Sequence, residues 1–459
     1  MNHSVCFNRQ LPVRDVDVLV AGGGPAGVGA AIAAARDGAK TLLVEQMNCL
    51  GGLGTAGLVP KWAPFHDQRG NAVIRGLLLS IVKEMVSGMP HLDGDERTFD
   101  WVPIDFELLK RIYDRRVAGS GAEVLFMTQL AAVEAADGRV QYAVLGNKDA
   151  LTAVRAKVYI DATGDGDLAA RAGADYEKGD PATGEMQGCT PTFILTNVDA
   201  AAFFAWRDEG GAKPFEAAFR RNQREAIARG KANGDLAIVE TECHISMLSP
   251  SSMAVNFSHL FGVDGTNAAQ LSRSMIDGRV RAAHLAAFMR KYFAGCERAD
   301  LTYTFGMQGV RETRRVKGEY YLTAEDYTSH RRFDDEVAIN TFMMDVHMNA
   351  AQWKRDAAGQ IDHHDMYKPY GPGEFHGVPW RCLQPAGLKN VLTAGRCISS
   401  DRRANGALRV MPMCVATGEA AGCAAAMMVS GALSDSRQVQ PEILRDRLRA
   451  HGAYLPAVE

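Results

Sequence analysis

Residues 16–45 constrain the fold of this chain more than any other stretch of its sequence. An apolar run at 18–21 is typical of a buried strand. The glycine-rich sequence at 22–27 follows it at once and fits the pattern G-x-G-x-x-G. Pro25 suits the first turn of a helix because its ring fixes φ, and Gly38 can end that helix. The stretch therefore predicts a strand, a tight turn and a helix.

A second apolar run at 41–44 closes this unit and ends in Glu45. Gly22 permits the tight turn, Gly24 lets a pyrophosphate approach the backbone, and Gly27 lets helix and strand pack closely. The helix N-terminus offers unpaired N–H groups to phosphates. Glu45 can accept hydrogen bonds from an adenosine ribose and would repel a 2′-phosphate, which disfavours NADP. The unit predicts a dinucleotide site; the alternative is a glycine-rich turn in another α/β protein.

Composition narrows the class of protein. A chain of 459 residues that is 47% hydrophobic can hold two or three domains with a large core. The net charge of −3 and the lack of a long basic block argue against nucleic acid or a membrane surface as partner. We expect no signal peptide and no membrane span, because no apolar run is long enough. The nine scattered cysteines suit reduced thiols in a cytoplasmic protein, without a metal site or disulfide framework.

The remaining patterns predict one discontinuous domain and one inserted lobe. A buried strand at 390–396 and a helix at 412–430, rich in Ala, Gly, Met and Cys, can pack closely against the first unit. We expect an α/β nucleotide domain built from residues 1–175 and 385–459, with an α+β cap or substrate domain at 176–384. The other expected elements are helices at 104–117, 199–212 and 214–232, strands at 123–127, 130–135, 140–145 and 157–161, and a hairpin turn at 136–139.

Three widely spaced stretches together resemble a known family. They are the N-terminal glycine-rich unit, ATGDGD at 162–167, and TAGRCIS at 393–399 followed by ALRVMPMCVATGEAAG at 407–422. The chain resembles FAD-dependent oxidoreductases of the glutathione-reductase-type superfamily. More narrowly, it resembles a bacterial FAD-dependent oxidoreductase family related to the fumarate reductase and succinate dehydrogenase flavoproteins. The resemblance extends to the cap through FGMQGVRETRRVKGEYYLTAEDY (305–327), Asp345-Val346-His347 and VPWRCLQP (378–385).

The resemblance implies FAD as cofactor, in a Rossmann-like domain with a parallel sheet and a β-meander. It also implies that the helix starting near Pro412 points its N-terminus at the flavin pyrimidine edge, where the helix dipole would stabilise negative charge. The glycine-rich loop at 51–57 approaches the ligand or is a flexible loop. The expected cofactor-binding residues are Gly22, Gly24, Pro25, Ala26, Gly27, Glu45, Gln46, Gly51, Gly52, Thr55, Leu130, Asp161, Thr163, Gly164, Gly395, Arg396 and Met411.

Histidines are the candidate bases for removing a proton from the substrate. His347 lies two residues after Asp345, and on an extended segment this spacing puts both side chains on one face. The pair is a catalytic base with its orienting acid, or a structural ion pair. His376, in a glycine-rich loop, is the second candidate, and His66 and His244 are weaker ones.

Arginines are the candidate binders of an acidic substrate or of the flavin phosphates. On a helix, Arg311, Arg314 and Arg315 would share a face; the alternative is surface ion pairing. The resemblance favours a site role for Arg311 and Arg314. Arg409 precedes the last long helix, where an arginine would face the flavin; the alternative is a salt bridge within its own domain. The four expected catalytic residues are His347, Arg311, Arg409 and His376.

Several departures from the family pattern leave alternatives open. The stretch Ser399–Asn405 lacks the histidine of relatives and carries Arg402 and Arg403, which suggests an acidic substrate. Cys49 could face the flavin as a redox thiol, although no C-x-x-x-x-C partner supports a disulfide reductase. Covalent attachment of the flavin through Cys49 or His66 stays open. Because no second G-x-G-x-x-G is present, the expected electron acceptor is oxygen, a quinone or a carrier protein.

The sequence thus predicts a flavoenzyme that takes a hydride from a small polar organic substrate onto flavin N5. Alcohol oxidation and C–C desaturation both remain open, as does a homo-oligomer. The alternatives are a flavoprotein of the same fold that modifies RNA, against which the missing basic patch argues, and a dehydrogenase that uses NAD alone. The NAD-only alternative leaves ATGDGD and the AGR stretch unexplained.

Overall fold

The centre of the molecule is a seven-stranded sheet with the order β5-β2-β1-β8-β7-β6, in which β19 also pairs with β8. Strands β5, β2, β1, β8 and β19 run parallel, whereas β6, β7 and β8 form an antiparallel meander. The predicted Rossmann-like α/β fold is confirmed. The strands are β1 (Val13–Ala21), β2 (Thr41–Val44), β5 (Glu123–Leu125), β6 (Gln129–Ala136), β7 (Arg139–Gly146), β8 (Leu151–Asp161) and β19 (Val391–Thr393). This computed structural model describes residues 10–67, 69–92, 94–99, 101–207, 215–357 and 367–458.

The parallel strands end at one edge of the sheet and bring three distant parts of the sequence together there. Ala21 of β1 lies beside Val44 of β2 and Asp161 of β8. Thr393 of β19 lies on the other side of Asp161. The loops that follow these strands therefore start side by side, at the carboxyl edge where open parallel sheets bind their ligands.

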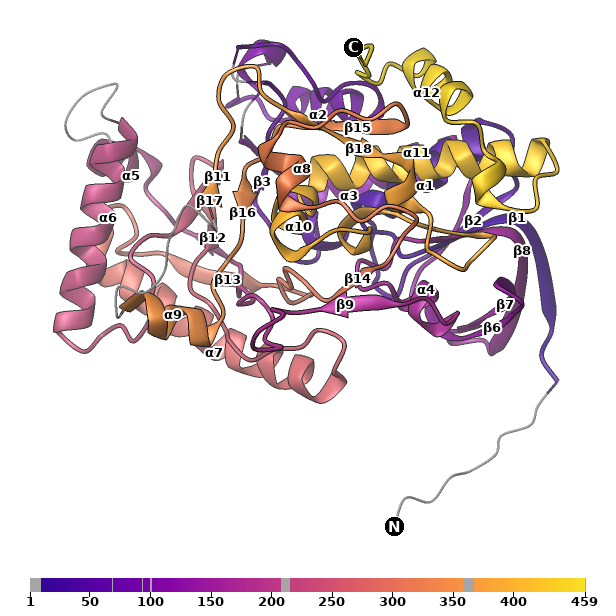
Figure 1. Cartoon of the computed structure of the whole chain (residues 1–459). Helices are drawn as coiled ribbons and strands as arrows, with labels where there is room; N and C mark the ends of the chain where they lie inside the picture. Colours follow the sequence, from indigo (N-terminus) through magenta and orange to yellow (C-terminus); the bar gives the residue numbers. More distant parts are fainter. Residues whose placement is uncertain are drawn as a thin grey trace.

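Two helices, α1 (Pro25–Arg36) and α11 (Met411–Ser430), pack against each other near the middle of the molecule (Figure 1). Their backbones touch, because a Cβ on Gly418 would lie 2.0 Å from the Ala26 carbonyl oxygen, and one on Gly422 would lie 2.3 Å from the Ala30 carbonyl oxygen. The predicted close packing of this helix is confirmed. By length and composition α11 could cross a membrane. However, 83% of its most apolar 18-residue stretch is buried inside the protein, as in a core helix.

The inserted segment carries its own antiparallel sheet, with the order β11-β12-β10-β13, seen on the left of Figure 1. Its hydrophobic core is separate from that of the main sheet and includes Phe193, Phe257, Leu285 and Phe293. The elements are β10 (Phe193–Thr196), β11 (His244–Ser249), β12 (Ser252–Asn256), β13 (Asp300–Thr304), α5 (Ala200–Arg207), α6 (Phe215–Ala232) and α7 (Ala268–Tyr292). The predicted helices at 199–212 and 214–232 correspond to α5 and α6, and residues 208–214 lie outside the described part of the chain.

The later part of the insert packs differently. Leu322, Val378 and Trp380 belong to the hydrophobic core of the main domain, together with residues of α1 and α11. The predicted cap boundaries at 176 and 384 stay a prediction; the packing favours a smaller cap that ends near β13. The remaining strands are β3 (Lys61–Trp62), β4 (Val102–Pro103), β9 (Tyr176–Lys178), β14 (Arg314–Val316), β15 (Glu336–Asn340), β16 (Met344–Asp345), β17 (Tyr367–Lys368) and β18 (His376–Pro379).

The structure differs from the sequence prediction around Arg314 and at the C-terminus, among other places. The segment around Arg314 is the strand β14, paired with β9, and not a helix, so Arg314 and Arg315 point to opposite sides. A C-terminal helix, α12, begins at a proline that suits its first turn, and it was not predicted. The remaining helices are α2 (Gly76–Ser87), α3 (Phe106–Gly119), α4 (Asp167–Arg171), α8 (Ala324–Thr328), α9 (Ala350–Ala357), α10 (Arg402–Leu408) and α12 (Pro441–Ala450).

Candidate active site

A cavity of about 240 Å³ opens at the carboxyl edge of the parallel strands, and we call it the nucleotide cavity. It runs past the end of β1, the N-terminus of α1, the end of β2 and the N-terminus of α11. Most of the predicted cofactor residues line it: Gly22, Gly24, Pro25, Ala26, Glu45, Gln46, Gly52, Leu130, Thr163, Gly164, Gly395, Arg396 and Met411. Sequence reasoning missed several further lining residues: Leu53, Thr128, Gln129, Asp167, Arg171, Met307 and Cys414.

Glycine is required at the start of this cavity. Gly22 has a φ of +97°, and a Cβ there would lie 2.5 Å from the Ala162 carbonyl oxygen. A Cβ on Gly27 would lie 1.8 Å from the Gly22 carbonyl oxygen, so this glycine permits the packing of helix on turn. A Cβ on Gly24 would meet no atom within 4 Å, so its backbone borders the open cavity. These three positions match the tasks predicted for a pyrophosphate-binding turn.

Glu45 is held rigidly at the end of β2. Its Oε2 accepts a hydrogen bond from the Gly23 N–H at 2.6 Å, and its Oε1 accepts one from the Met47 N–H at 2.7 Å. Burial raises the pKa of this carboxyl group, while the hydrogen bonds oppose the rise. The side chain is 4% exposed and lines the nucleotide cavity. The carboxylate is therefore placed to accept hydrogen bonds from a bound ribose.

Four predicted cofactor residues do not line the cavity. Besides Gly27, these are Gly51, Thr55 and Asp161. The Thr55 hydroxyl donates to the Leu50 carbonyl at 2.6 Å, so it shapes its own loop. Asp161 is fully buried, where burial raises its pKa to about 6, and it accepts hydrogen bonds from Thr163 Oγ1 and the Ala169 N–H. Thr55 and Asp161 thus shape the loops around the cavity without lining it, and their contact with the cofactor stays a prediction.

A second cavity, of about 290 Å³, meets the nucleotide cavity at Leu53, Arg396, Arg409 and Met411, which line both. We call it the substrate cavity. Met411 begins α11, so the N-terminus of this helix lies at the junction. The residues that line the substrate cavity but not the nucleotide cavity are Val59, Pro60, Lys61, Ala63, Trp101, Thr190, Thr192, His244, Asn256, Gly309, Val310, Arg311, Phe342, Met343, Asp345, His347, Val410 and Pro412.

Three of the four predicted catalytic residues meet in the substrate cavity. His347 Nε2 lies 3.4 Å from Asp345 Oδ2, so the predicted pairing of these side chains is present. Arg409 Nη2 donates to the same oxygen at 2.9 Å and to the Asp345 carbonyl at 2.8 Å. Arg311 lines the same cavity from the segment that follows Gly309. Whether any of them acts in catalysis stays a prediction.

The charges of this group are set by burial and by the two arginines. Burial lowers the pKa of His347 to about 3, and the positive charge of Arg311 adds to the effect. Burial raises the Asp345 pKa, but contact with His347 and the positive charges of Arg409 and Arg311 outweigh it, so the pKa lies well below its usual range. At neutral pH the cavity therefore holds a neutral imidazole beside an ionised carboxylate.

Arg311 lines this cavity without a carboxylate partner among the described residues. Its guanidinium donates to the Gly188 carbonyl and forms no ion pair with any residue in the described part of the chain. Arg409 is paired with Asp345, and Arg396 with Asp165 at 2.7 Å. Burial and the nearby Arg409 lower the Arg311 pKa to about 10, so it stays protonated at pH 7.

Other predicted site residues lie elsewhere. His376 is fully buried on β18, where its Nδ1 bonds with the Tyr370 hydroxyl, and it lines neither cavity. Arg314 pairs with Asp167 outside the substrate cavity. Arg402 is buried and paired with Glu312, so the acidic substrate inferred from it loses that basis.

The thiol and histidine considered for redox or covalent roles are also outside the cavities. Cys49 is buried near Thr55, and burial raises the pKa of its thiol. His66 Nδ1 bonds with the Phe99 carbonyl oxygen at 3.0 Å. Neither residue lines the nucleotide or the substrate cavity. The structure therefore brings neither side chain to where a flavin would be bound.

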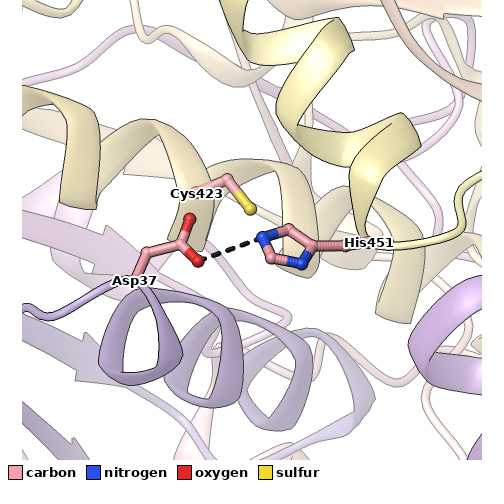
Figure 2. A group of neighbouring side chains, drawn as sticks. All are labelled: Asp37, Cys423 and His451. Carbon is pink, nitrogen blue, oxygen red and sulfur yellow. Dashed lines mark hydrogen bonds and ion pairs between the residues drawn. The ribbon is translucent and has the colours of Figure 1, made fainter.

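One cluster outside the cavities has the residue types of a metal site. Asp37, Cys423 and His451 lie together between α1, α11 and the end of α12 (Figure 2). His451 Nε2 lies 3.1 Å from an Asp37 oxygen, but the guanidinium groups of Arg36 and Arg447 pair with the same carboxylate. A divalent cation there would face two positive charges. The cluster is therefore an ion-pair network that joins the helices.

The fold and the nucleotide cavity define an α/β protein that binds a dinucleotide. The sequence profile of the FAD dependent oxidoreductase family matches residues 17–448, and the chain belongs to this family. It is an enzyme with FAD as its cofactor. The cavity fits this group, because the backbone of Gly24 borders open space and the Glu45 carboxylate faces the cavity. In addition, Arg396 Nη1 is buried without a hydrogen-bond partner in the described residues.

Several solved structures match the chain at low identity. A geranylgeranyl bacteriochlorophyll reductase-like protein from Thermoplasma acidophilum is 12% identical over 95% of this chain and 83% of its own, with a TM-score of 0.44. The flavin-dependent brominase Bmp2 is 13% identical over 95% and 84%, with a TM-score of 0.45. The p-nitrophenol 4-monooxygenase PnpA from Pseudomonas putida DLL-E4 is 10% identical over 96% and 89%, with a TM-score of 0.44. Among curated proteins, no relative matches the chain.

Proposed function

We propose that this FAD-dependent oxidoreductase is a dehydrogenase or oxidase that removes a hydride and a proton from a small polar substrate with an anionic group. The substrate would occupy the substrate cavity, which adjoins the nucleotide cavity at the start of α11. The bound FAD supplies the hydride acceptor, at flavin N5. The chain's own residues bind the substrate, orient it and take its proton.

The unpaired guanidinium of Arg311 carries this proposal. A cation that lines a cavity, is largely removed from water and has no carboxylate partner is stabilised by an anionic ligand. A planar guanidinium suits a carboxylate, because two of its N–H groups can donate in parallel. Lys61, Arg396 and Arg409 line the same cavity, and Asp345 is the one acidic residue among its described lining residues. The field in the cavity therefore favours an anion.

His347 is the proposed base. Its imidazole is neutral at pH 7 and has a free lone pair, while burial and Arg311 lower its pKa and so weaken it as a base. An ionised Asp345 at 3.4 Å from Nε2 would stabilise the imidazolium that forms. Arg409 holds the Asp345 carboxylate in place. The N-terminus of α11 would stabilise negative charge that develops on the cofactor side of the junction.

We further propose that oxygen, a quinone or a carrier protein accepts the electrons, in a cytoplasmic enzyme that forms a homo-oligomer or acts alone. We also propose that, within the family, the chain is related to the glutathione-reductase-type and fumarate reductase flavoproteins. Membership of a FAD-dependent family sets the NAD-only dehydrogenase aside. RNA modification is the second candidate function. Its one basis is that some RNA-modifying flavoproteins share this nucleotide domain.

The test is anaerobic bleaching of the bound flavin. The purified holoenzyme is mixed with 2-hydroxy acids (glycolate, lactate, malate), the matching amino acids (glycine, alanine, aspartate) and succinate. The neutral amides lactamide and alaninamide serve as controls, and NADH and NADPH as separate arms. We expect one anionic class to bleach the flavin and its amide to react far more slowly. Succinate alone would indicate desaturation, and a hydroxy acid would indicate alcohol oxidation.

Two outcomes would contradict the proposal. If the amides bleach the flavin as fast as the acids, the cavity does not select an anion. If NADH or NADPH bleaches it and no organic acid does, the enzyme receives its hydride from a nicotinamide and is not a dehydrogenase of the proposed kind.

A further inference from the structure

His347 is bonded through its second ring nitrogen to another histidine. His347 Nδ1 lies 2.9 Å from His259 Nε2, while His347 Nε2 faces Asp345 in the substrate cavity. The two rings lie 5.0 Å apart between centroids. The imidazole proposed as base is thus connected at one nitrogen to the substrate cavity and at the other to a group behind it.

His259 is in turn bonded to a buried acid. His259 Nδ1 meets Glu240 Oε1, on the chain segment between α6 and β11. Glu240 is 7% exposed, and its second oxygen, Oε2, has no hydrogen-bond partner in the described residues. A carboxylate bonded to a histidine orients the ring and stabilises positive charge on it. The unbroken row of bonds from His347 through His259 to Glu240 also gives a proton a path away from the base. Burying a carboxylate oxygen without a hydrogen-bond partner costs free energy, so this oxygen calls for an explanation, and a role in accepting a proton is one.

His259 also borders a cavity on the far side of the cap. This outer cavity, of about 260 Å³, lies between the loop at 259–263 and α7, and its lining includes the exposed residues Gln270, Arg273 and Asp277. The His259 ring is held by stacking on Phe261, with centroids 5.9 Å apart. A small molecule from solvent can therefore approach His259 without passing through the substrate cavity.

We propose that His259 and Glu240 form a proton relay that carries the substrate proton away from His347. The relay rests on the proposed function, because it serves the base of that reaction. In one tautomer His347 Nδ1–H donates to His259 Nε2, and His259 Nδ1–H donates to Glu240. In this tautomer His347 Nε2 carries a lone pair 3.4 Å from the Asp345 carboxylate, and a proton taken from the substrate turns that repulsion into attraction.

In the reaction of a hydroxy acid, the substrate loses a hydride and a proton. The substrate C–H bond would break with both of its electrons leaving in the hydride, and FAD, when bound, would supply the acceptor for that hydride. The substrate O–H proton bonds to His347 Nε2, the His347 Nδ1 proton passes to His259 Nε2, and the His259 Nδ1 proton passes to Glu240. The substrate becomes a carbonyl compound, both histidines end neutral, and Glu240 ends as a carboxylic acid. His347 therefore does not stay positively charged. A positive charge there would be repelled by the nearby guanidinium of Arg311.

Substitutions at positions 259 and 240 distinguish a proton relay from a structural contact, because some of them keep the hydrogen bonds but cannot pass a proton. A glutamine at position 259 can still hold the His347 ring by a hydrogen bond, but it cannot pass a proton. An alanine leaves a space next to the outer cavity that imidazole from solvent can enter. Glu240→Gln keeps the size of the side chain and removes the proton acceptor.

The experiment measures the anaerobic rate of flavin reduction by lactate, or by the member of the panel above that bleaches the parent fastest, with FAD content checked for each variant. We expect His259→Gln and Glu240→Gln to be slowed by about 10²-fold, the lower end for loss of general-base function. Added imidazole should restore His259→Ala toward the parent rate and leave Glu240→Gln unchanged. His284→Gln, an exposed histidine on α7, is the matched control and should react at the parent rate.

The outcomes separate the relay from the proposed function. If His259→Gln and Glu240→Gln reduce flavin at the parent rate while His347→Gln is slow, the relay is wrong and His347 acts without it. If His259→Ala is slow and imidazole gives no recovery, His259 has a structural role and the relay is also wrong. If His347→Gln itself reacts at the parent rate, the proposed function loses its base, and that result is read before the others.

Discussion

At the scale of single residues, the proposed function predicts that Arg311 selects anionic substrates. Its guanidinium lines the substrate cavity without a carboxylate partner in the described residues. For Arg311→Gln we expect kcat/KM for the anionic substrate to fall by about 10- to 100-fold, as for the loss of a hydrogen bond between charged groups. Steady-state kinetics with the acid and with its neutral amide measure this. The amide is the internal control: an equal loss for both would mean that Arg311 acts on the fold and not on the anion.

His347 tests the chemical step. Because its imidazole is neutral and faces an ionised Asp345, His347→Gln should slow flavin reduction by about 10²–10⁴-fold, the range for loss of a general base. Stopped-flow absorbance of the flavin, at equal FAD content, gives the rate. A variant that keeps the parent rate would show that the His347–Asp345 pair is structural.

Glu45 tests the binding of the cofactor. Glu45→Gln keeps the shape of the side chain and removes its charge, which the Gly23 and Met47 N–H groups stabilise. We expect FAD to be held more weakly by about 1.5–3 kcal/mol. Titration of the apoprotein with FAD, followed by flavin fluorescence, measures the change. Glu419→Gln, a buried carboxylate that pairs with Arg36 outside both cavities, is the control and should bind FAD normally.

The residues that sequence reasoning placed correctly are those fixed by the local chain. Gly22, Gly24 and Glu45 follow strand ends, so their position relative to a ligand is set within one strand–helix–strand unit. Asp161 also ends a strand but does not line the nucleotide cavity, because its carboxylate is bonded to the N–H of Ala169 in the helix that follows. Cavity residues such as Lys61 were missed because only the tertiary fold brings their loops to the site.

At the scale of elements, the contact between α1 and α11 holds the two halves of the nucleotide domain together. A Cβ on Gly418 would lie 2.0 Å from the Ala26 carbonyl oxygen, so Gly418→Ala forces the helices apart. We expect a loss of about 1–3 kcal/mol in the free energy of unfolding and a lower melting temperature. FAD should also be released more readily, because Ala26 lines the nucleotide cavity.

Gly119→Ala is the matched control for this change. Gly119 ends α3, and a Cβ there meets no atom within 4 Å, so the substitution adds the same methyl group to open space. Differential scanning fluorimetry of both variants compares them directly. If Gly418→Ala melts with the parent, the helices tolerate the extra atom and their close approach is not required.

Elements were predictable where a pattern was strong and local. The bounds of β2 match the predicted strand at 41–44, because an apolar run follows a glycine turn. The arginine-rich segment at 309–315 was expected as a helix, but pairing with β9 makes its end a strand. That pairing joins residues far apart in the sequence, and periodicity within one segment carries no signal for it.

At the scale of the whole molecule, buried neutral histidines make stability depend on pH. His376 is fully buried, and burial lowers its pKa to about 3, whereas an unfolded histidine titrates near 6.5. Between these values the unfolded chain binds a proton at this position and the folded chain does not. The free energy of unfolding should therefore fall as the pH is lowered from 6.5 toward 3, and be retained above 6.5.

The prediction is specific to His376 when the parent is compared with His376→Gln. Between pH 7 and pH 5 the parent should lose on the order of 2 kcal/mol more than the variant, since the variant has no imidazole to protonate on unfolding. Urea unfolding followed by circular dichroism at both pH values gives the two differences. His284→Gln removes an exposed histidine and should lose as much as the parent. An equal loss in His376→Gln and the parent would place the acid sensitivity in other groups, with the half-buried His347 as the next to test.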